Sequence, residues 1–199
     1  KEDIDVIDIC TPTFTHCDVR VKAADAGKNI LCEKPFCLTY EAAQRMVDYC
    51  KERNVKIMTA QVVRFKKEYE ILADYFKSGK LGAVRLGFLR RLTSRAGRVA
   101  RNVKWYDDPS KSGGALFDLL IHDLDFIYSI LGRPGQVYAI GCKSPFGCWD
   151  ELEVNLSFGN GARITIEACS YMPGKYPFTV AFRINGDKGC LEYSARAAV

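Results

Sequence analysis

The stretch KNILCEKP, residues 28–35, decides how this sequence is interpreted. Asn29 to Cys32 is a short, apolar run, which is typical of a buried strand. Glu33-Lys34-Pro35 follows that strand directly. Open α/β sheets bind ligands in the crevice outside the carboxyl ends of their strands, so Lys34 lies where a cation can hold a hydroxyl or a ribose. The tripeptide alone favours the alternative, a solvated lysine before a loop proline. Pro35 can fix the direction of Lys34, including through a cis peptide bond.

The segments around this stretch alternate between strand and helix signals. Ile4 to Cys10 is an apolar, β-rich run before it, and Val55 to Thr59 is a third strand after it. Such strands with short helical links form right-handed parallel crossovers. Residues 1–62 are therefore expected to form one half of a doubly wound parallel sheet, in the order β-α-β-α-β.

Two helices are expected between these strands. Thr15 and Asp18 form a capping box that starts a helix running to about Ala26, where Gly27 stops it. Thr39 caps the second helix. The apolar positions of that helix recur at helical spacing and comprise Ala42, Ala43, Met46, Val47 and Cys50.

The rhythm changes after residue 62. Helices are expected from about Lys66 to Ser78 and from about Ala115 to Leu131, separated by a strand that begins at Val84. Alternating strands with tight turns follow. Residues 63–199 are therefore predicted to form an α+β domain with an open, mainly antiparallel sheet, whose last strands are Val137–Cys142, Leu152–Phe158, Ile164–Ala168, Phe178–Ile184 and Cys190–Tyr193.

The long helix carries Asp118, His122 and Asp125 on one stripe, nearly opposite its apolar face. A carboxylate one turn before a histidine can orient the imidazole for proton transfer near neutral pH. A solvated helix shows the same stripe, and periodicity alone favours that simpler interpretation. No metal site is expected, because the spacing supplies only two ligands. Gly113-Gly114 before the helix suits either close approach of a ligand or a plain turn.

Thr11-Pro12 ends the first strand, and His16 begins the next helix. The backbone N–H groups of a helix N-terminus can bind an anion, and His16 could contact a phosphate or amide there. A surface histidine in the first helical turn is the alternative.

Composition limits the class of protein. The 199 residues, 48% of them hydrophobic, can bury a sizeable core, and no apolar run is long enough to span a bilayer. Nine scattered cysteines without a C-x-x-C pair indicate free thiols in a reducing compartment, so a cytoplasmic location is expected. The net charge of +5 includes a crowded basic stretch. A loop that is solvated or meets an anionic ligand is favoured over nucleic-acid binding, because no recognised nucleic-acid module surrounds these residues: Arg85, Arg90, Arg91, Arg95, Arg98, Arg101 and Lys104.

The order of these motifs is more specific than any one of them. Thr11-Pro12 with His16, then Glu33-Lys34-Pro35, then Trp105, then Gly113-Gly114 with the Asp118 stripe resembles the glucose-fructose oxidoreductase / inositol dehydrogenase / MocA family over nearly the whole chain. The resemblance implies a Rossmann domain that binds NAD or NADP, followed by a substrate domain whose antiparallel sheet forms a homo-oligomer. It implies hydride transfer between the cofactor and a secondary alcohol of a sugar or polyol.

The resemblance also assigns roles to residues. Lys34, Asp118 and His122 would be catalytic, with His122 transferring the proton and the other two positioning the hydroxyl. The substrate site would comprise these three residues and Arg64. The cofactor site would comprise Thr11, Pro12, His16, Glu33, Lys34, Pro35 and Trp105.

Two features depart from the family pattern. The strand and G-x-G-x-x-G turn that open the family's Rossmann domain are missing, so the chain is expected to be a fragment. Leu119-Leu120-Ile121 replaces a small residue of the family before His122, which puts the close packing of that turn in question. The alternatives to an enzyme are a catalytically silent relative that senses a ligand and a domain that serves only for interaction or dimerisation.

Overall fold

The structure is a computed structural model that describes residues 3–94 and 104–197. The chain forms two compact units. Unit 1 comprises residues 1–61 and 110–112, and unit 2 comprises residues 62–109 and 113–199. Each unit has its own cluster of buried apolar side chains. The division of labour expected from the sequence, with cofactor binding in residues 1–62 and substrate binding in residues 63–199, stays a prediction.

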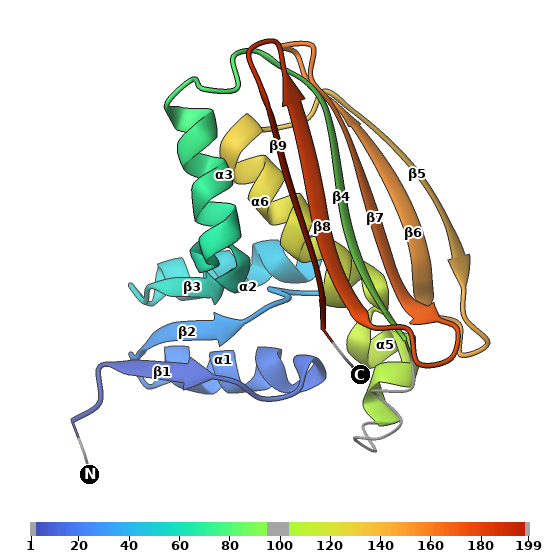
Figure 1. Ribbon diagram of the computed structural model, residues 1–199. Coiled ribbons are helices and arrows are strands. Elements are labelled where there is room, and N and C mark those ends of the chain that lie inside the picture. The colour runs from blue at the N-terminus through green and yellow to red at the C-terminus, as the bar shows by residue number, and fades with distance from the viewer. Residues whose placement is uncertain (1–2, 95–103, 198–199) are drawn as a thin grey trace. The chain divides into compact units, whose positions relative to one another are not determined.

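Unit 1 contains a three-stranded parallel sheet in the order β1-β2-β3 (Figure 1). Ile9 pairs with Cys32, and Cys32 pairs with Thr59, so the three carboxyl ends lie at one edge. Helices α1 and α2 contact each other and enclose a core that includes Ile9, Ile30 and Met46. The predicted half of a doubly wound sheet is confirmed, with bounds β1 (Val6–Ile9), α1 (His16–Asp25), β2 (Asn29–Glu33), α2 (Tyr40–Glu52) and β3 (Ile57–Ala60).

The helix ends of unit 1 agree with the sequence at two of three positions. The Thr39 hydroxyl accepts a hydrogen bond of 3.2 Å from the Ala42 N–H, as expected of an N-cap. Gly27 has a φ of +66° after α1. The capping box at Thr15 is wrong, because Thr15 has helical backbone angles and closes a short 3-10 turn, η1 (Thr13–Thr15). Its hydroxyl donates to the Pro12 carbonyl instead of capping α1.

Unit 2 contains a six-stranded sheet in the order β5-β6-β7-β4-β8-β9. Only β4 and β7 run parallel, and every other neighbouring pair is antiparallel. The open, mainly antiparallel sheet and the hairpin turning at residues 159–161 are therefore confirmed. The strands are β4 (Val84–Ser94), β5 (Gln136–Lys143), β6 (Trp149–Ser157), β7 (Arg163–Met172), β8 (Phe178–Gly186) and β9 (Cys190–Ala197).

The helices α3 and α6 of unit 2 lie against one face of this sheet (Figure 1). Between them the chain forms short helical turns. The helices among the described residues are η2 (Val62–Phe65), α3 (Lys67–Lys77), η3 (Lys104–Asp107), α5 (Pro109–Ser112), η4 (Leu116–Leu120) and α6 (Ile121–Leu131), and α5 is divided between the two units.

The long helix expected from Ala115 to Leu131 is not uniform. Its first part, η4, is a π-helical turn, and only α6 is a regular α-helix. A π-turn holds more residues than an α-turn, so the buried positions before and after it do not follow one period. Leu119 and Phe126 are buried in the core, whereas Phe117 is only half-buried. Leu119 and Leu120, whose packing the sequence put in question, are buried in the core, with 6% and 0% of their surface exposed.

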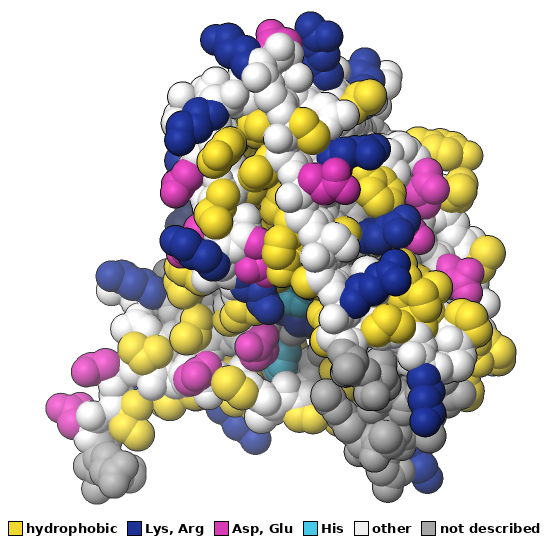
Figure 2. All heavy atoms as spheres, viewed as in Figure 1, with side chains coloured by type: hydrophobic (Ala, Val, Ile, Leu, Met, Phe, Trp, Pro, Cys, Tyr) yellow, Lys and Arg dark blue, Asp and Glu magenta, His cyan; other side chains and the backbone are white. Residues whose placement is uncertain are grey.

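The basic stretch is not a loop over its described part. Residues 85–94 belong to β4, and the Arg91 side chain is buried inside unit 2. Arg90 pairs with Glu167 at 3.0 Å on the neighbouring strand. Arg95, Arg98 and Arg101 lie outside the described residues. Figure 2 shows other basic side chains gathered at the end of unit 2 where α3 ends and β8 turns into β9, a region that contains the exposed Lys77, Lys80 and Lys188.

Within residues 3–94 and 104–197, no helix combines the length and the apolar character that crossing a membrane requires.

Candidate active site

Lys34 lies in unit 1 immediately after β2, at the carboxyl edge of the parallel sheet. The peptide bond between Lys34 and Pro35 is cis, as considered from the sequence. The Lys34 N–H donates to the Glu33 carboxylate, with 3.2 Å between N and Oε2. Pro35 is buried, while Glu33 and Lys34 are half-buried. The turn is thus anchored by its proline and leaves the lysine within reach of the sheet edge.

His16 is buried at the start of α1, with 3% of its surface exposed. Its Nε2 lies 2.8 Å from the Thr11 carbonyl oxygen. A carbonyl only accepts, so Nε2 carries the proton. Burial lowers the pKa of His16 and keeps the ring neutral. The surface-histidine interpretation is wrong, because His16 ties the end of β1 to the start of α1 from inside unit 1. A direct contact between His16 and the cofactor stays a prediction.

The exposed Thr11 and Pro12 complete the carboxyl edge of unit 1. The Thr11 and Thr15 hydroxyl oxygens lie 2.7 Å apart, and because Thr15 donates its proton to the Pro12 carbonyl, Thr11 donates to Thr15 and can still accept a hydrogen bond. One edge of the sheet thus carries the Thr11 hydroxyl, the Glu33 carboxylate and the Lys34 ammonium. These groups fit the hydrogen-bonding needs of the nicotinamide ribose of a dinucleotide. The 199 residues contain no G-x-G-x-x-G turn, so they do not supply the usual pyrophosphate cradle.

Asp118 and His122 lie in unit 2, on η4 and on the first turn of α6. Both side chains are half-buried, as is Asp125 one turn later. The functional interpretation of this stripe stays a prediction. π-turns inside α-helices occur frequently at functional sites, and this one lies where the candidate acid and base are carried.

Asp125 binds Arg64 of η2 through two hydrogen bonds of 2.6 Å, Nε to Oδ2 and Nη2 to Oδ1. The hydrogen bond with Asp125 raises the pKa of Arg64. A paired guanidinium and carboxylate of this geometry is directional and locks both side chains. The proposed contact of Arg64 with substrate stays a prediction, and the structure adds that Arg64 fixes the turn of α6 that follows His122.

Asp123, whose burial was not predicted from the sequence, is the most enclosed charge among the described residues of unit 2. Its carboxylate accepts from Arg91 at 3.1 Å twice and from the Tyr69 hydroxyl at 2.6 Å. Arg91 also donates to the Tyr69 oxygen at 2.8 Å. Burial tends to lower the pKa of Arg91, but the Asp123 carboxylate raises it, and the net direction is upward. The ion pair joins α6 to β4 and α3. Periodicity carries no signal for this ion pair, because it does not show which segments meet.

Gly114 approaches the backbone of β6 closely, which accounts for the glycine pair before η4. Its φ is +69°, and a Cβ atom there would lie 2.8 Å from the Trp149 carbonyl oxygen. The next residue donates its N–H to the Asp150 carboxylate at 3.2 Å. The plain-turn interpretation is favoured, because the chain itself fills the space. Trp105, on η3, stacks on Tyr106 with ring centroids 4.0 Å apart, and its cofactor contact stays a prediction.

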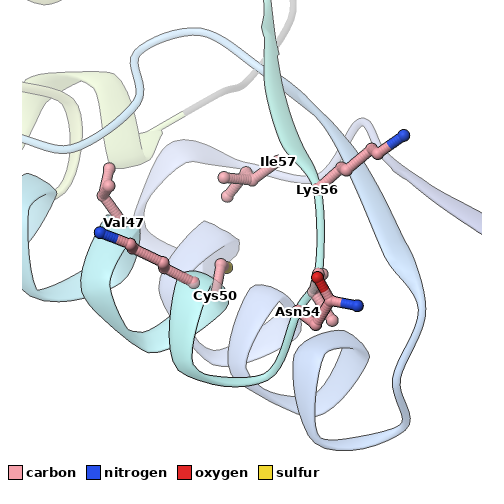
Figure 3. A pocket seen from close by; sticks show the side chains of 7 residues that line it. Val47, Cys50, Asn54, Lys56 and Ile57 are labelled. Carbon is pink, nitrogen blue, oxygen red and sulfur yellow. The ribbon is translucent and has the colours of Figure 1, made fainter.

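A pocket of about 350 Å³ in unit 1 lies between the end of α2 and the start of β3 (Figure 3). Val47, Cys50 and Ile57 contribute its apolar walls. Because Ile57 is at the amino end of β3, the pocket opens at the sheet edge opposite Lys34. It is not part of the candidate site.

Comparison with known proteins identifies the family. Residues 69–192 match the family described as GFO/IDH/MocA C-terminal domain. The chain belongs to the GFO/IDH/MocA family. Residues 1–61 match its oxidoreductase family with an NAD-binding Rossmann fold, so NAD is the cofactor of the family to which this segment belongs. The resemblance expected from the motifs is confirmed.

Proteins similar to this chain are named for different activities. A levoglucosan dehydrogenase from Pseudarthrobacter phenanthrenivorans is 27% identical over 96% of this chain and 56% of its own length. A 2,7-anhydro-N-acetylneuraminate hydratase from Escherichia coli (strain K12) is 30% identical over 95% of this chain and 51% of its own. A solved levoglucosan dehydrogenase in complex with NADH and levoglucosan is 28% identical, with a TM-score of 0.84 over 97% of this chain and 55% of that one. The chain spans about half the length of the curated relatives it matches.

Proposed function

We propose that the protein containing this chain is an NAD-dependent dehydrogenase that oxidises a secondary alcohol of a sugar or polyol. The observation that carries this proposal is the set of Lys34, Asp118 and His122 in a chain of the GFO/IDH/MocA family. A lysine at the carboxyl edge of the Rossmann sheet, and a carboxylate and an imidazole at a π-turn, are the groups that alcohol oxidation needs.

Each residue has a separate role in the proposed reaction. Bound NAD would supply the acceptor for the hydride that leaves the alcohol carbon. His122 accepts the hydroxyl proton, because a neutral imidazole is a base near neutral pH. The Asp118 carboxylate helps to position the substrate, and the Lys34 ammonium donates to the reacting oxygen and stabilises the negative charge that develops on it. The oxygen is left as a carbonyl.

Neighbouring contacts hold the segments that carry Lys34 and His122. Two ion pairs hold the part of α6 that follows His122, through Asp123 and Asp125. The buried Pro35 anchors the Lys34 turn, and the buried His16 holds the Thr11 end of β1. Preorganised groups lower the barrier because they do not have to be ordered when the reaction occurs.

The proposal is tested with the full-length protein by following NADH formation over a panel of sugars and polyols. The expected result is NADH formation with at least one of them, lost in the Lys34→Met variant. Absence of both NADH formation and any product over the whole panel, with NADH still bound, would favour the catalytically silent relative.

A second candidate function is a redox-neutral hydration. The observation that favours it is the 30% identity with the hydratase, which exceeds the 27% identity with the levoglucosan dehydrogenase. The same panel separates the two, because a hydratase converts its substrate without net accumulation of NADH. Mass spectrometry of the product would show the gain of one water instead of the loss of two hydrogens.

We also propose that the protein forms a homo-oligomer through the sheet of unit 2 and works in the cytoplasm. The edge strand β5 is exposed along its whole length, including Val137, Tyr138 and Ile140. Exposed apolar edge strands invite pairing with another chain. The nine cysteines are free thiols, which supports a reducing compartment. Analytical ultracentrifugation of the full-length protein tests the oligomer, and a monomer at all concentrations would contradict it.

A further inference from the structure

Arg20 is a fully buried cation in unit 1. It lies on α1, one turn after His16, and none of its surface is exposed. Its Nη1 donates to the Phe36 carbonyl oxygen and lies 3.8 Å from the Cys37 sulfur. Its Nη2 lies 3.1 Å from the Cys32 sulfur. The guanidinium carbon is 4.6 Å from the centre of the Phe36 ring.

No carboxylate within residues 3–94 and 104–197 pairs with Arg20. The neighbouring thiols do not supply the missing charge. Burial raises the pKa of Cys32 and of Cys37, and the opposing effect of Arg20 does not reverse that shift. Both thiols are therefore neutral near pH 7. A buried cation whose charge has no partner is costly, and the cost is offset here only by a carbonyl, two sulfurs and an aromatic face.

The contacts of Arg20 enclose one short segment. Cys32 precedes Lys34 by two residues, and Phe36 and Cys37 follow it by two and three. All polar contacts of the guanidinium thus lie on the strand end before Lys34 and on the loop after it. Its planar fork fixes the direction of each donor, which a flexible or apolar side chain does not do.

We propose that Arg20 is a positioning residue that holds the turn carrying Lys34, and that it acts on the reaction only through Lys34. This inference rests on the proposed function, since it assigns a role to Lys34 there. An apolar side chain of similar volume would fill the same space, so packing alone does not require an arginine. The arginine adds bonds on both sides of the lysine, and these restrict where the ammonium can lie.

The test compares the full-length wild type with Arg20→Met, which keeps much of the volume and removes every donor. The first readout is the rate at which acetic anhydride modifies Lys34, measured by mass spectrometry against Lys28 of the same unit. We expect the Lys34 rate to change in Arg20→Met while the Lys28 rate does not. The second readout is kcat/KM, which we expect to fall about tenfold, because small displacements of a catalytic group are costly.

Arg53→Met is the matched control. Arg53 also belongs to unit 1, lies 3.4 Å from the Tyr49 ring and pairs with Asp25 at 2.9 Å, but it contacts neither side of Lys34. Its loss is expected to leave both readouts unchanged. Arg20→Gln keeps one amide donor toward the Phe36 carbonyl. It is expected to restore part of the wild-type Lys34 modification rate and part of the wild-type kcat/KM.

Unchanged Lys34 modification in folded Arg20→Met would overturn the proposal, as would failure of both Arg20 variants to fold, which would assign Arg20 to the core alone. The modification rate does not depend on turnover. If the wild type shows no dehydrogenase activity while Arg20→Met alters Lys34 modification, the proposed function fails and the positioning role stands.

Discussion

The carboxylate of Asp123 and the guanidinium of Arg91 form an ion pair that is closed to solvent, with side-chain exposures of 0% and 5%. Asp123 follows His122 in the chain, and Arg91 lies inside β4. The Tyr69 hydroxyl bonds to both partners. The pair therefore fixes the first turn of α6 against the sheet, next to the candidate catalytic histidine.

Removing one partner of this ion pair is expected to destabilise the protein strongly. Asp123→Ala leaves the Arg91 cation buried without its carboxylate, which costs roughly 3–5 kcal/mol. Urea unfolding of the full-length protein measures the free energy of unfolding. The double variant Arg91→Met/Asp123→Leu removes both charges and is expected to be more stable than Asp123→Ala, because no unpaired charge remains. A double variant no more stable than the single one would contradict this account.

Variants of Arg64 and Asp125 distinguish a positioning role of Arg64 from a direct contact with the substrate. If Arg64 acts only through Asp125, then Arg64→Ala and Asp125→Ala lower kcat/KM alike, and the double variant adds little to either. The free energy of unfolding is expected to change by about 1 kcal/mol or less, because Arg64 is 44% exposed and solvent weakens the pair. A rise in KM confined to Arg64→Ala would instead indicate that Arg64 contacts the substrate.

Stability is expected to depend on pH through His16. Its pKa is lowered by burial below the ordinary value of 6.5, so the unfolded chain binds a proton that the folded chain does not. The free energy of unfolding should therefore fall as the pH drops through 6.5 toward the lowered pKa of the folded state. His16→Gln, which keeps an amide donor toward the Thr11 carbonyl, should show a smaller fall. Equal pH dependence in the two proteins would argue against a neutral buried ring.

Gly114→Ala tests the close approach at the start of the π-turn. The left-handed backbone costs about 1–2 kcal/mol with any L side chain, and the new Cβ would also meet the Trp149 carbonyl. Gly79→Ala is the control, since its φ is +70° and no atom lies within 4 Å of the added Cβ. Thermal unfolding is expected to rank Gly114→Ala below Gly79→Ala. The reverse order would mean that β6 moves freely away from the turn.

The sequence predicts the parts of the fold that depend on local patterns. Alternating apolar residues identify the β6–β7 hairpin, and Thr39 and Gly27 mark helix ends because capping and left-handed glycine are local. The π-turn from Leu116 to Leu120 was not predictable in this way, since its residues fit an α-helix equally well.

The missed parts of the site are charges whose burial depends on distant partners. Asp123 is enclosed by residues from β4 and α3, and Arg20 by the loop after β2. Periodicity assigns such charges to solvent because it contains no information on which segments meet. The surface alternative for His16 is wrong although its partner, the Thr11 carbonyl, is only five residues away, because burial depends on packing that local spacing does not show.

The most direct test of the central claim is the His122→Ala variant of the full-length protein, with Tyr128→Ala as a control at an exposed position of the same helix. Steady-state NADH formation and NADH affinity by fluorescence are measured for both. Loss of a general base is expected to lower kcat by roughly 10²- to 10⁴-fold, while NADH affinity stays near that of the wild type. Turnover in His122→Ala equal to that of Tyr128→Ala would contradict the assignment of His122 as the proton-transfer residue.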